Sequence, residues 1–262
     1  MKYYIIAGEA SGDLHASNLM KALKVKDPDA VFRFWGGDKM QAVGGALVKH
    51  YRELAFMGFW EVFINLLTIL KNITFCKKDI LQFNPDAVIY VDYPGFNLRI
   101  AAWAKKQGFK NLYYISPQIW AWKENRISKI RRDLDALYVI LPFEETYYKE
   151  KHNYIAQFVG NPLVDVIQDS LLTKNTFRKD QNLNSEIPII ALLPGSRKQE
   201  IIKMMPTFLK VINRFPQYKF IIAAAPGIDF DWYQQFLKGQ PVLLVQDQTY
   251  ACLLYTSPSP RD

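Results

Sequence analysis

The sequence feature that most constrains the fold is the stretch at residues 87–97, Ala-Val-Ile-Tyr-Val-Asp-Tyr-Pro-Gly-Phe-Asn. Its apolar part stops at Asp92, a Tyr-Pro-Gly turn follows, and Asn97 is placed to cap a helix that runs to Gln107. This order predicts a buried parallel strand, a loop at its carboxyl end and a crossover helix. Because open parallel sheets bind ligands at those ends, Asp92 is a candidate for chemistry in a cleft. The alternative is a carboxylate that only caps the turn.

The same strand–turn–helix order recurs along the chain and predicts an α/β fold with two Rossmann-like domains. The composition, 50% hydrophobic and 22% charged, is that of a globular protein. Strands are predicted at residues 3–7, 31–35, 87–91, 111–115, 136–141, 155–159, 187–193, 219–225 and 241–245. Residues 168–186 are polar and lack a buried-strand pattern, so we expect an N-terminal domain over 1–167 and an incomplete C-terminal domain over 168–251.

Residues 252–262 break the preceding pattern and look like the in-frame translation of a sequencing adapter. The genuine protein is therefore expected to end near Ala251. The cysteines, Cys76 and Cys252, are far apart, and the chain has only three histidines. Neither a disulfide framework nor a Cys/His metal site is supported, so we predict no metal and no cofactor, and a reduced, cytosolic location.

A glycine-rich turn follows the first predicted strand. Its candidate substrate-binding residues are Gly8, Glu9, Ser11, Gly12 and Asp13. Ser11 or Asp13 is expected to cap the next helix, and the glycines allow a ligand close to the backbone N–H groups. The two acids disfavour a bare phosphate, so sugar hydroxyls are the preferred ligand. The turn is not G-x-G-x-x-G, and a plain strand–helix connection is the alternative.

Residues 54–70 form the most apolar stretch, shorter than the ~20 residues that a spanning helix needs. Its large apolar side chains follow helical spacing: Phe59, Trp60, Phe63, Leu66, Leu67 and Leu70. Lys71, Lys77 and Lys78 follow them. Two interpretations stay open, an ordinary core helix and a helix that lies in a membrane interface or grips acyl chains.

The loop after the strand at residues 111–115 contains Ser116, Gln118 and Trp120, which are candidates for substrate binding because two tryptophans and a glutamine exceed what core filling requires. A basic run follows it, formed by Lys123, Arg126, Lys129, Arg131 and Arg132. The run is either a solvated face or a contact with phosphate or an anionic bilayer. The net charge of +8 and pI near 9.2 agree with such a partner. Nucleic acid is not predicted, because no recognised module accompanies the run.

The Pro-Gly-Ser-Arg sequence at residues 194–197 lies between a predicted strand and a helix start. Gly195, Ser196 and the helix N–H groups can bind phosphate, and Arg197 can pair with a diphosphate. A capped helix with a solvated Arg is the alternative. No Walker sequence is present, which disfavours ATP hydrolysis. Together the two halves suggest group transfer from a nucleotide donor in a cleft between them, with Asp92 as general base and Arg197 stabilising the leaving diphosphate.

Seven motifs in order carry a resemblance to a known family. They are Ala7-Gly-Glu-Ala-Ser-Gly-Asp13, Met57-Gly-Phe-Trp-Glu-Val62, Asp92-Tyr-Pro-Gly-Phe-Asn97, Tyr114-Ile-Ser-Pro-Gln-Ile-Trp-Ala-Trp122, Leu141-Pro-Phe-Glu144, Phe158-Val-Gly160 and Leu192-Leu-Pro-Gly-Ser-Arg197. With them the chain resembles the bacterial lipid-A-disaccharide synthases, inverting glycosyltransferases of the GT-B fold.

The resemblance implies that UDP-2,3-diacylglucosamine and 2,3-diacylglucosamine 1-phosphate are joined into the β-1,6-linked disaccharide 1-phosphate with release of UDP. It ties Asp92 and Arg197 to activity and implies that residues 57–70, including Met57, contact acyl chains and anionic lipid at the cytoplasmic face of the inner membrane. The family's Ser-Gly-Thr donor loop has no counterpart here, so this fragment is expected to be inactive. A non-catalytic binder of anionic lipid, or another GT-B enzyme such as a UDP-sugar epimerase, are the alternatives.

Overall fold

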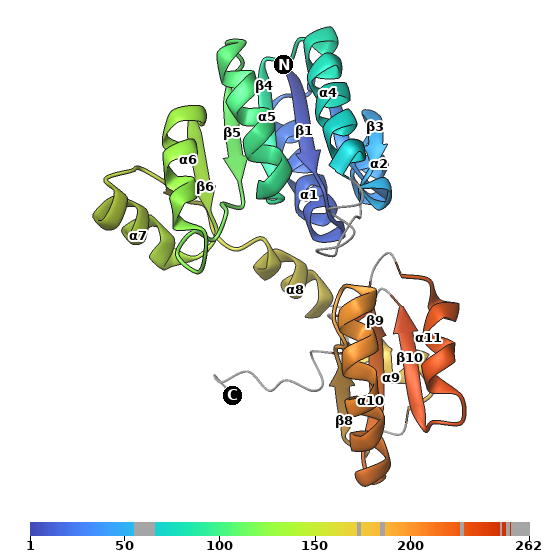
Figure 1. Cartoon of the computed structure of the whole chain (residues 1–262). Helices are drawn as coiled ribbons and strands as arrows, with labels where there is room; N and C mark the ends of the chain where they lie inside the picture. Colours follow the sequence, from blue (N-terminus) through green and yellow to red (C-terminus); the bar gives the residue numbers. More distant parts are fainter. Residues whose placement is uncertain are drawn as a thin grey trace. The chain divides into compact units, whose positions relative to one another are not determined.

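The computed structural model describes residues 1–54, 66–171, 174–183, 187–225, 228–246, 248–249 and 252. The chain divides into two compact units, Met1–Pro162 and Leu163–Asp262 (Figure 1). The first unit contains a seven-stranded sheet in the order β3-β2-β1-β4-β5-β6-β7. All six strand pairings in this sheet are parallel.

The elements of the first unit alternate along the chain. They are β1 (Lys2–Ala7), α1 (Ala10–Lys26), β2 (Val31–Gly36), α2 (Asp38–Val43), β3 (Ala46–His50), η1 (Tyr51–Glu53), α4 (Leu66–Phe83), β4 (Ala87–Val91), α5 (Pro94–Lys106), β5 (Asn111–Tyr114), η2 (Glu124–Arg126), α6 (Ile127–Asp133), β6 (Ala136–Val139), α7 (Pro142–His152) and β7 (Gln157–Phe158).

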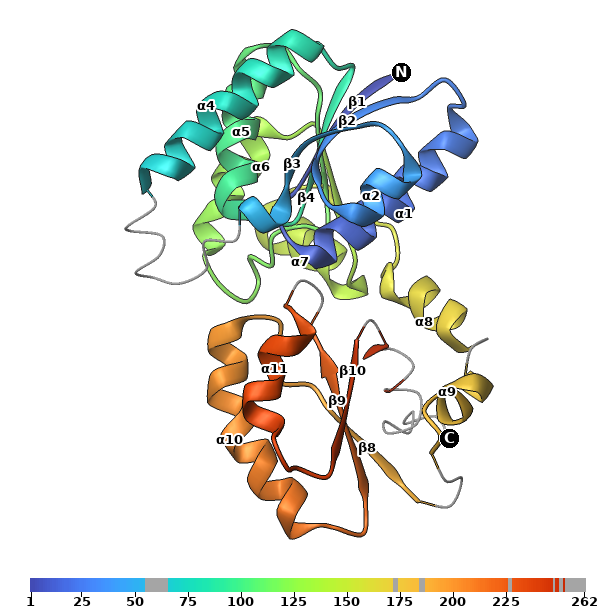
Figure 2. The same ribbon diagram turned by 90° about the vertical axis from the view of Figure 1, so that its right-hand side faces the viewer.

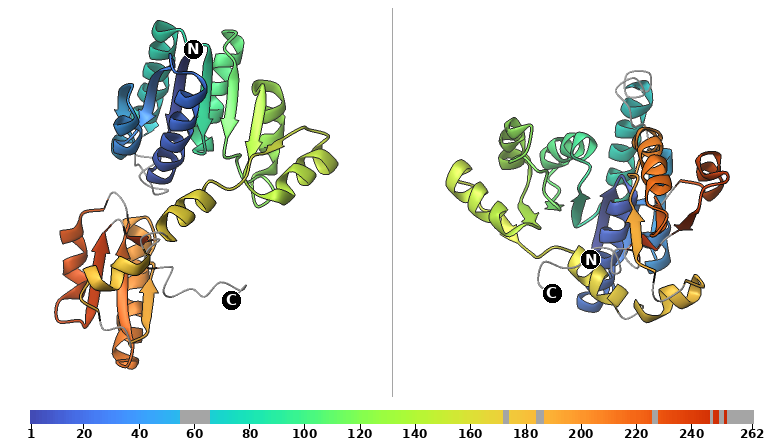
Figure 3. Two further views of the ribbon diagram at one scale, coloured as in Figure 1. Left: turned by 180° about the vertical axis from the view of Figure 1, so that it is seen from behind. Right: turned by 90° about the horizontal axis from the view of Figure 1, so that it is seen from below.

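Both faces of this sheet are covered by helices, because successive strand residues point to opposite faces and both sets are apolar. Tyr4 and Ile6 pack with α4, α5 and α6 on one face, whereas Tyr3, Ile5 and Ala7 pack with α1 and α2 on the other. Figure 2 shows the two helical layers on either side of the strands, and Figure 3 shows α1 against the opposite face from behind.

A buried polar network ties α4 to the sheet. Asp79 accepts two hydrogen bonds from Arg33, at 2.8 and 2.6 Å, and one from the Tyr4 hydroxyl at 2.8 Å. The Tyr4 hydroxyl in turn accepts from the Trp35 indole at 2.9 Å. Because each buried polar group has a partner, the network fixes where α4 lies on the sheet.

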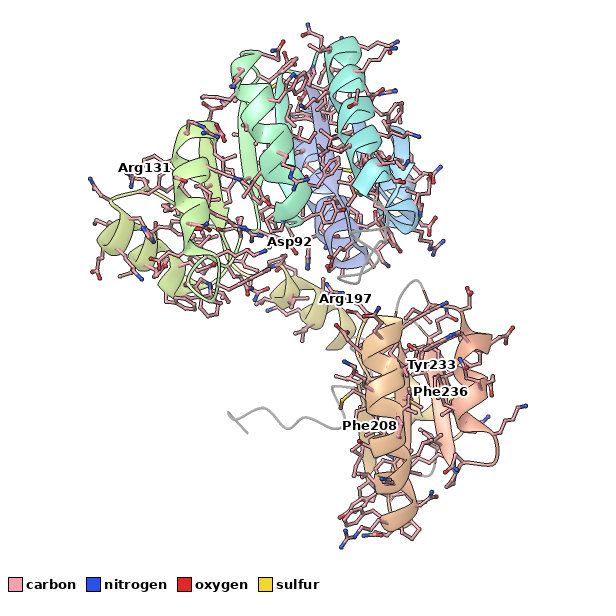
Figure 4. The ribbon with its side chains drawn as sticks, in the orientation of Figure 1. Asp92, Arg131, Arg197, Phe208, Tyr233 and Phe236 are labelled. Carbon is pink, nitrogen blue, oxygen red and sulfur yellow. The ribbon has the colours of Figure 1, made fainter. Side chains whose placement is uncertain are left out.

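The second unit has a three-stranded parallel sheet in the order β10-β9-β8. Its elements are α8 (Leu163–Leu171), α9 (Lys174–Asp180), β8 (Ile189–Leu192), α10 (Lys198–Arg214), β9 (Lys219–Ala224), α11 (Phe230–Leu237) and β10 (Val242–Gln246). Phe208 from α10 and Tyr233 and Phe236 from α11 share one core with the sheet (Figure 4). Phe177 of α9 and Cys252 belong to the core of the other face.

The predicted strands are present within two residues at either end, but β3 was not predicted, and two helix-cap predictions are wrong. The helix after Asp92 begins at Pro94, so Asn97 lies inside its first turn rather than at the cap. The first helix begins at Ala10 and has no side-chain cap from Ser11 or Asp13. Among its described residues, the polar stretch at 168–186 has no strand, and it contains the end of α8 and the whole of α9.

Candidate active site at the carboxyl ends of the strands

Three predicted loops meet at one edge of the first sheet. Ala7 at the end of β1 pairs with Val91 at the end of β4, and Val91 pairs with Tyr114 at the end of β5. The loops that follow these strands therefore lie side by side. They hold the glycine-rich turn, Asp92 and the loop from Ser116 to Trp122.

Backbone strain gathers at this edge. Apart from three asparagines, the non-glycine residues with φ in the left-handed region, within the described part of the chain, are Asp92, Tyr93, Ile115 and Lys123, with φ of 45°, 51°, 62° and 53°. Asparagine, and to a lesser extent aspartate, adopts this region, but tyrosine, lysine and above all β-branched isoleucine do so at a cost. Such residues cluster at active sites, because the surrounding structure holds them there for a purpose.

The backbone of Asp92 is held by two buried side chains. Its carbonyl oxygen accepts a hydrogen bond from the Tyr113 hydroxyl at 2.6 Å and another from Asn97 Nδ2 at 2.7 Å. Asn97 has no exposed surface, and its Nδ2 also lies 3.4 Å from the carbonyl oxygens of Ile6 and Val91. Asn97 therefore lies beneath the loop and holds the Asp92 backbone. Asn97 is also a candidate for substrate binding, and that assignment stays a prediction.

The Asp92 side chain is half-buried at the end of β4 (Figure 4). Burial raises the pKa of its carboxyl above the ordinary 3.8, while hydrogen bonding to the Tyr93 backbone and the charge of Arg126 act in the opposite direction. A raised pKa makes the carboxylate a stronger base than an exposed aspartate, and a group with this property in a strained loop is suited to accept a proton.

The glycine-rich turn packs directly on the Asp92 loop. Gly8 is buried, and a Cβ added there would lie 2.4 Å from the Tyr93 ring, so only glycine fits beneath this tyrosine. Burial, and next the charge of Glu9, raise the pKa of the Tyr93 hydroxyl. Glu9 is half-buried, Ser11 is exposed and Gly12 is buried against Ala7.

Asp13 caps a different helix from the one expected. It is 2% exposed, and its carboxylate accepts hydrogen bonds from the backbone N–H groups of Gly37 at 2.7 Å, Lys39 at 3.0 Å and Met40 at 3.1 Å. These are amides at the start of α2, which would otherwise lack partners. The carboxylate therefore fastens α2 to α1, and its assignment to substrate binding stays a prediction.

The third loop combines a buried polar anchor with exposed aromatic rings. The Ser116 hydroxyl is buried 2.7 Å from that of Tyr148. Gln118 is exposed, and its backbone carbonyl accepts from the Ala121 and Trp122 amides at 3.1 and 3.3 Å. Trp120 is also exposed, and its indole donates to Glu144 at 3.3 Å. An exposed Trp ring held by a buried acid leaves apolar surface on this loop, and its role in substrate binding stays a prediction.

In the second unit, the loop of Gly195, Ser196 and Arg197 precedes α10 as predicted, but its amides are partnered. Glu200 accepts from the N–H groups of Ser196 at 3.0 Å and Arg197 at 3.3 Å. Gly195 has φ of 119°, and a Cβ there would lie 2.7 Å from Glu200 Oε2. Arg197 is exposed at the N-terminal end of α10, 3.7 Å from Glu200 (Figure 4). That Asp92 and Arg197 face one cleft stays a prediction.

The predicted membrane residues fall largely outside the described chain. Met57, Phe59, Trp60 and Phe63 lie outside it, and of Leu66 only the backbone is described, as the first residue of α4. Leu67 is 73% exposed and Leu70 48% exposed, so neither is an ordinary core residue. Among the described residues, no helix is both long enough and apolar enough to span a bilayer.

Sequence reasoning missed two residues of the Asp92 environment. Tyr113 lies in β5, where the sequence pattern indicates an ordinary core residue. The residues around it in the sequence do not indicate that its hydroxyl donates to the Asp92 carbonyl in a neighbouring loop. Arg126 was noted only as one charge of the basic run, although its charge opposes the rise in the pKa of Asp92 that burial causes.

The fold and the site define an α/β protein of the GT-B class, with Rossmann-like units and candidate residues on the loops after the strands. The UDP-GlcNAc 2-epimerase of Neisseria meningitidis, solved with UDP-GlcNAc, aligns over 97% of this chain and 75% of its own with a TM-score of 0.67 and 12% identity. The Methanocaldococcus jannaschii enzyme of that name, solved with UDP-GlcNAc and UDP, aligns with a TM-score of 0.64 and 13% identity over 97% of this chain and 75% of its own. At these identities the likeness concerns the fold alone.

The family is shown by sequence. The profile of the lipid-A-disaccharide synthetase family matches residues 3–240. Lipid-A-disaccharide synthases of Coxiella burnetii and Trichlorobacter lovleyi are 37% and 36% identical, each over 94% of this chain and over 66% and 65% of their own lengths. The chain belongs to the lipid-A-disaccharide synthase family, as its motifs predicted. It spans just under two thirds of the length of these curated relatives.

Proposed function

We propose that this chain supplies the acceptor side, and part of the donor side, of a glycosyltransferase that joins UDP-2,3-diacylglucosamine to 2,3-diacylglucosamine 1-phosphate. Family membership supports the reaction. The observation that carries the mechanism is Asp92, a carboxyl group with a raised pKa on a strained loop whose backbone is held by Tyr113 and Asn97.

Asp92 acts as general base in this proposal. The primary hydroxyl of the acceptor sugar forms a bond to the anomeric carbon of the donor, and its proton passes to the Asp92 carboxylate. The bond from that carbon to the diphosphate breaks on the opposite side, which inverts the configuration and releases UDP. Arg197 pairs with the charge that grows on the diphosphate, and no metal ion is needed.

The apolar face at the start of α4 supports a lipid substrate. The exposed Leu67 and Leu70 continue the apolar stretch that the family resemblance assigns to acyl chains. The site would then work at the surface of an anionic membrane on the cytoplasmic side, with α4 contacting the acyl groups and Asp92 reaching the sugar.

The test joins residues 1–251 to the C-terminal segment of the Coxiella burnetii relative that lies beyond the matched region. It measures UDP release by this extended chain with diacylated donor and acceptor. Asp92→Asn should lower kcat by roughly 10²–10⁴-fold, the usual contribution of a positioned base. Arg197→Ala should lose comparable activity, whereas Arg214→Ala, an arginine at the far end of the same helix, should not. Unchanged turnover in Asp92→Asn would remove the base assignment. Vesicle binding without UDP release by the extended chain would favour a non-catalytic lipid-binding protein.

A further inference from the structure

A pocket rich in basic side chains lies beside Asp92 in the first unit. It has a volume of about 260 Å³ and is lined by Pro94, Gly95, Leu98, Arg99, Lys123, Asn125, Arg126 and Lys129. One wall comes from the start of α5 and the other from η2 and α6. Four lining residues are cations and none is an acid, so the pocket is built for an anion.

The structure sorts the basic run into paired and unpaired charges. Arg131 donates to the His152 carbonyl on the outside of α6, and Arg132 pairs with Asp133 at 2.7 Å (Figure 4). The acid of the run, Glu124, is held by Lys151 at 2.8 Å. By contrast, no ion pair with a described carboxylate involves Arg99, Lys123, Arg126 or Lys129. Three cations of the basic run, Lys123, Arg126 and Lys129, therefore line the pocket together with Arg99 of α5.

Two of these cations, Lys123 and Arg126, are positioned by contacts with the Trp122 ring. Lys123 is held in the left-handed region, with its ammonium 4.3 Å from the centre of the Trp122 ring, and the Arg126 guanidinium lies 5.0 Å from the same ring. The opposite wall is the first turn of α5, where Pro94 has no N–H and Phe96 donates to the Tyr93 carbonyl at 3.2 Å, so the Gly95 N–H is the amide of this turn that can meet a ligand. A Cβ added at Gly95 would meet nothing within 4 Å, so an anion can approach this turn.

We propose that this pocket binds the phosphate monoester of the sugar acceptor. The identity of the acceptor rests on the proposed function; the anion site itself does not. Arg126 lines the pocket and also acts on Asp92, so the bound phosphate and the base lie at neighbouring points. In a sugar 1-phosphate, one ring separates the phosphate from the primary hydroxyl. A monoester dianion matches four cations better than the single charge of a phosphodiester headgroup does.

The experiment measures binding of glucosamine 1-phosphate to the 262-residue chain by titration calorimetry at physiological ionic strength, with glucosamine and inorganic phosphate as comparison ligands. Arg99→Ala and Lys129→Ala should each weaken the Kd for the sugar phosphate about tenfold, the usual effect of losing one charge-assisted contact. Lys106→Ala removes one positive charge from the far end of α5 and should leave the Kd unchanged. Thermal melting verifies that each variant is folded.

The same variants are tested against phosphatidylglycerol vesicles. If Arg99→Ala and Lys129→Ala lose only vesicle binding, the pocket is a bilayer contact and the proposal fails. It fails equally if the wild-type chain does not bind the sugar phosphate, or if Lys106→Ala weakens binding as much as the pocket variants do. Because binding requires no transfer, the pocket can stand even if Asp92→Asn leaves turnover intact, and it can fail while the transferase assignment holds.

Discussion

The two hydrogen bonds that converge on the Asp92 carbonyl predict a strong energetic coupling between Asn97 and Tyr113. Tyr113→Phe removes the 2.6 Å bond but leaves the carbonyl paired with Asn97, so it should cost about 1 kcal/mol. Asn97→Ala removes the 2.7 Å bond and leaves a small void, for about 2 kcal/mol. Each single variant keeps one donor on the carbonyl.

The double variant leaves a buried acceptor without a side-chain donor, which adds a desolvation cost of roughly 1–3 kcal/mol. The expected total is therefore roughly 4–6 kcal/mol instead of the additive 3, an appreciable part of the 5–15 kcal/mol that stabilises a domain. Tyr90→Phe is the matched control. The Tyr90 hydroxyl is also buried, donates to Asn111 at 2.9 Å and shares no partner with Asn97. The free-energy changes of Tyr90→Phe and Asn97→Ala should therefore add.

The assay is urea unfolding followed by tryptophan fluorescence in a Trp232→Phe background. In that background every remaining tryptophan lies in the unit Met1–Pro162, so the signal reports only the unit that carries the site. A coupling free energy within about 0.5 kcal/mol of zero for Asn97→Ala with Tyr113→Phe would refute the idea that both side chains hold the same strained carbonyl.

Further predictions concern the surroundings of the site. Asp13→Ala should lower the free energy of unfolding by roughly 2–4 kcal/mol, because three amides of α2 lose a charged acceptor; the same urea assay measures it. Arg126→Ala should raise the pKa of Asp92 further above 3.8, since the cation favours the anionic form; carboxyl ¹³C NMR titration should show this, and a downward shift would contradict it. Accordingly, the activity of the extended chain should fall as pH decreases through the pKa of Asp92, with its acid limb at higher pH in Arg126→Ala. Asp92→Gly should abolish UDP release yet leave stability equal or higher, because glycine relieves the left-handed backbone; clear destabilisation would contradict this.

Six strands of the first sheet and the three of the second could be predicted from the sequence, because they are short apolar runs bounded by turn residues, as at Ala87–Val91. The edge strand β3 was not predicted. The order of the motifs also identified the edge where the candidate residues meet. Helix starts were less predictable. Asparagine is a common helix cap, but the helix begins at Pro94, three residues before Asn97. The Asn97 side-chain amide donates to the Asp92 carbonyl instead of capping the helix.

The hydrogen-bond partners of Asp13 in α1 and Glu200 in α10 differ in how far the sequence could predict them. Asp13 caps α2 because folding brings the start of that helix beside α1, and no short-range pattern reports such a contact. Glu200 could have been anticipated, since an acid three residues after the N-cap Arg197 has the spacing of a capping box. That spacing shows why the amides before α10 are paired with a side chain rather than open to phosphate.

The strain at the edge of the sheet has one physical explanation that joins these observations. A left-handed residue costs of order 1–3 kcal/mol, and glycine would remove the cost at Asp92 and Tyr93. Glycine could supply neither the carboxylate nor the ring that packs on Gly8. The cost is offset by the buried donors of Asn97 and Tyr113, which satisfy the carbonyl in this conformation alone. Because those donors belong to α5 and β5, the position of the base depends on how this helix and this strand pack against each other.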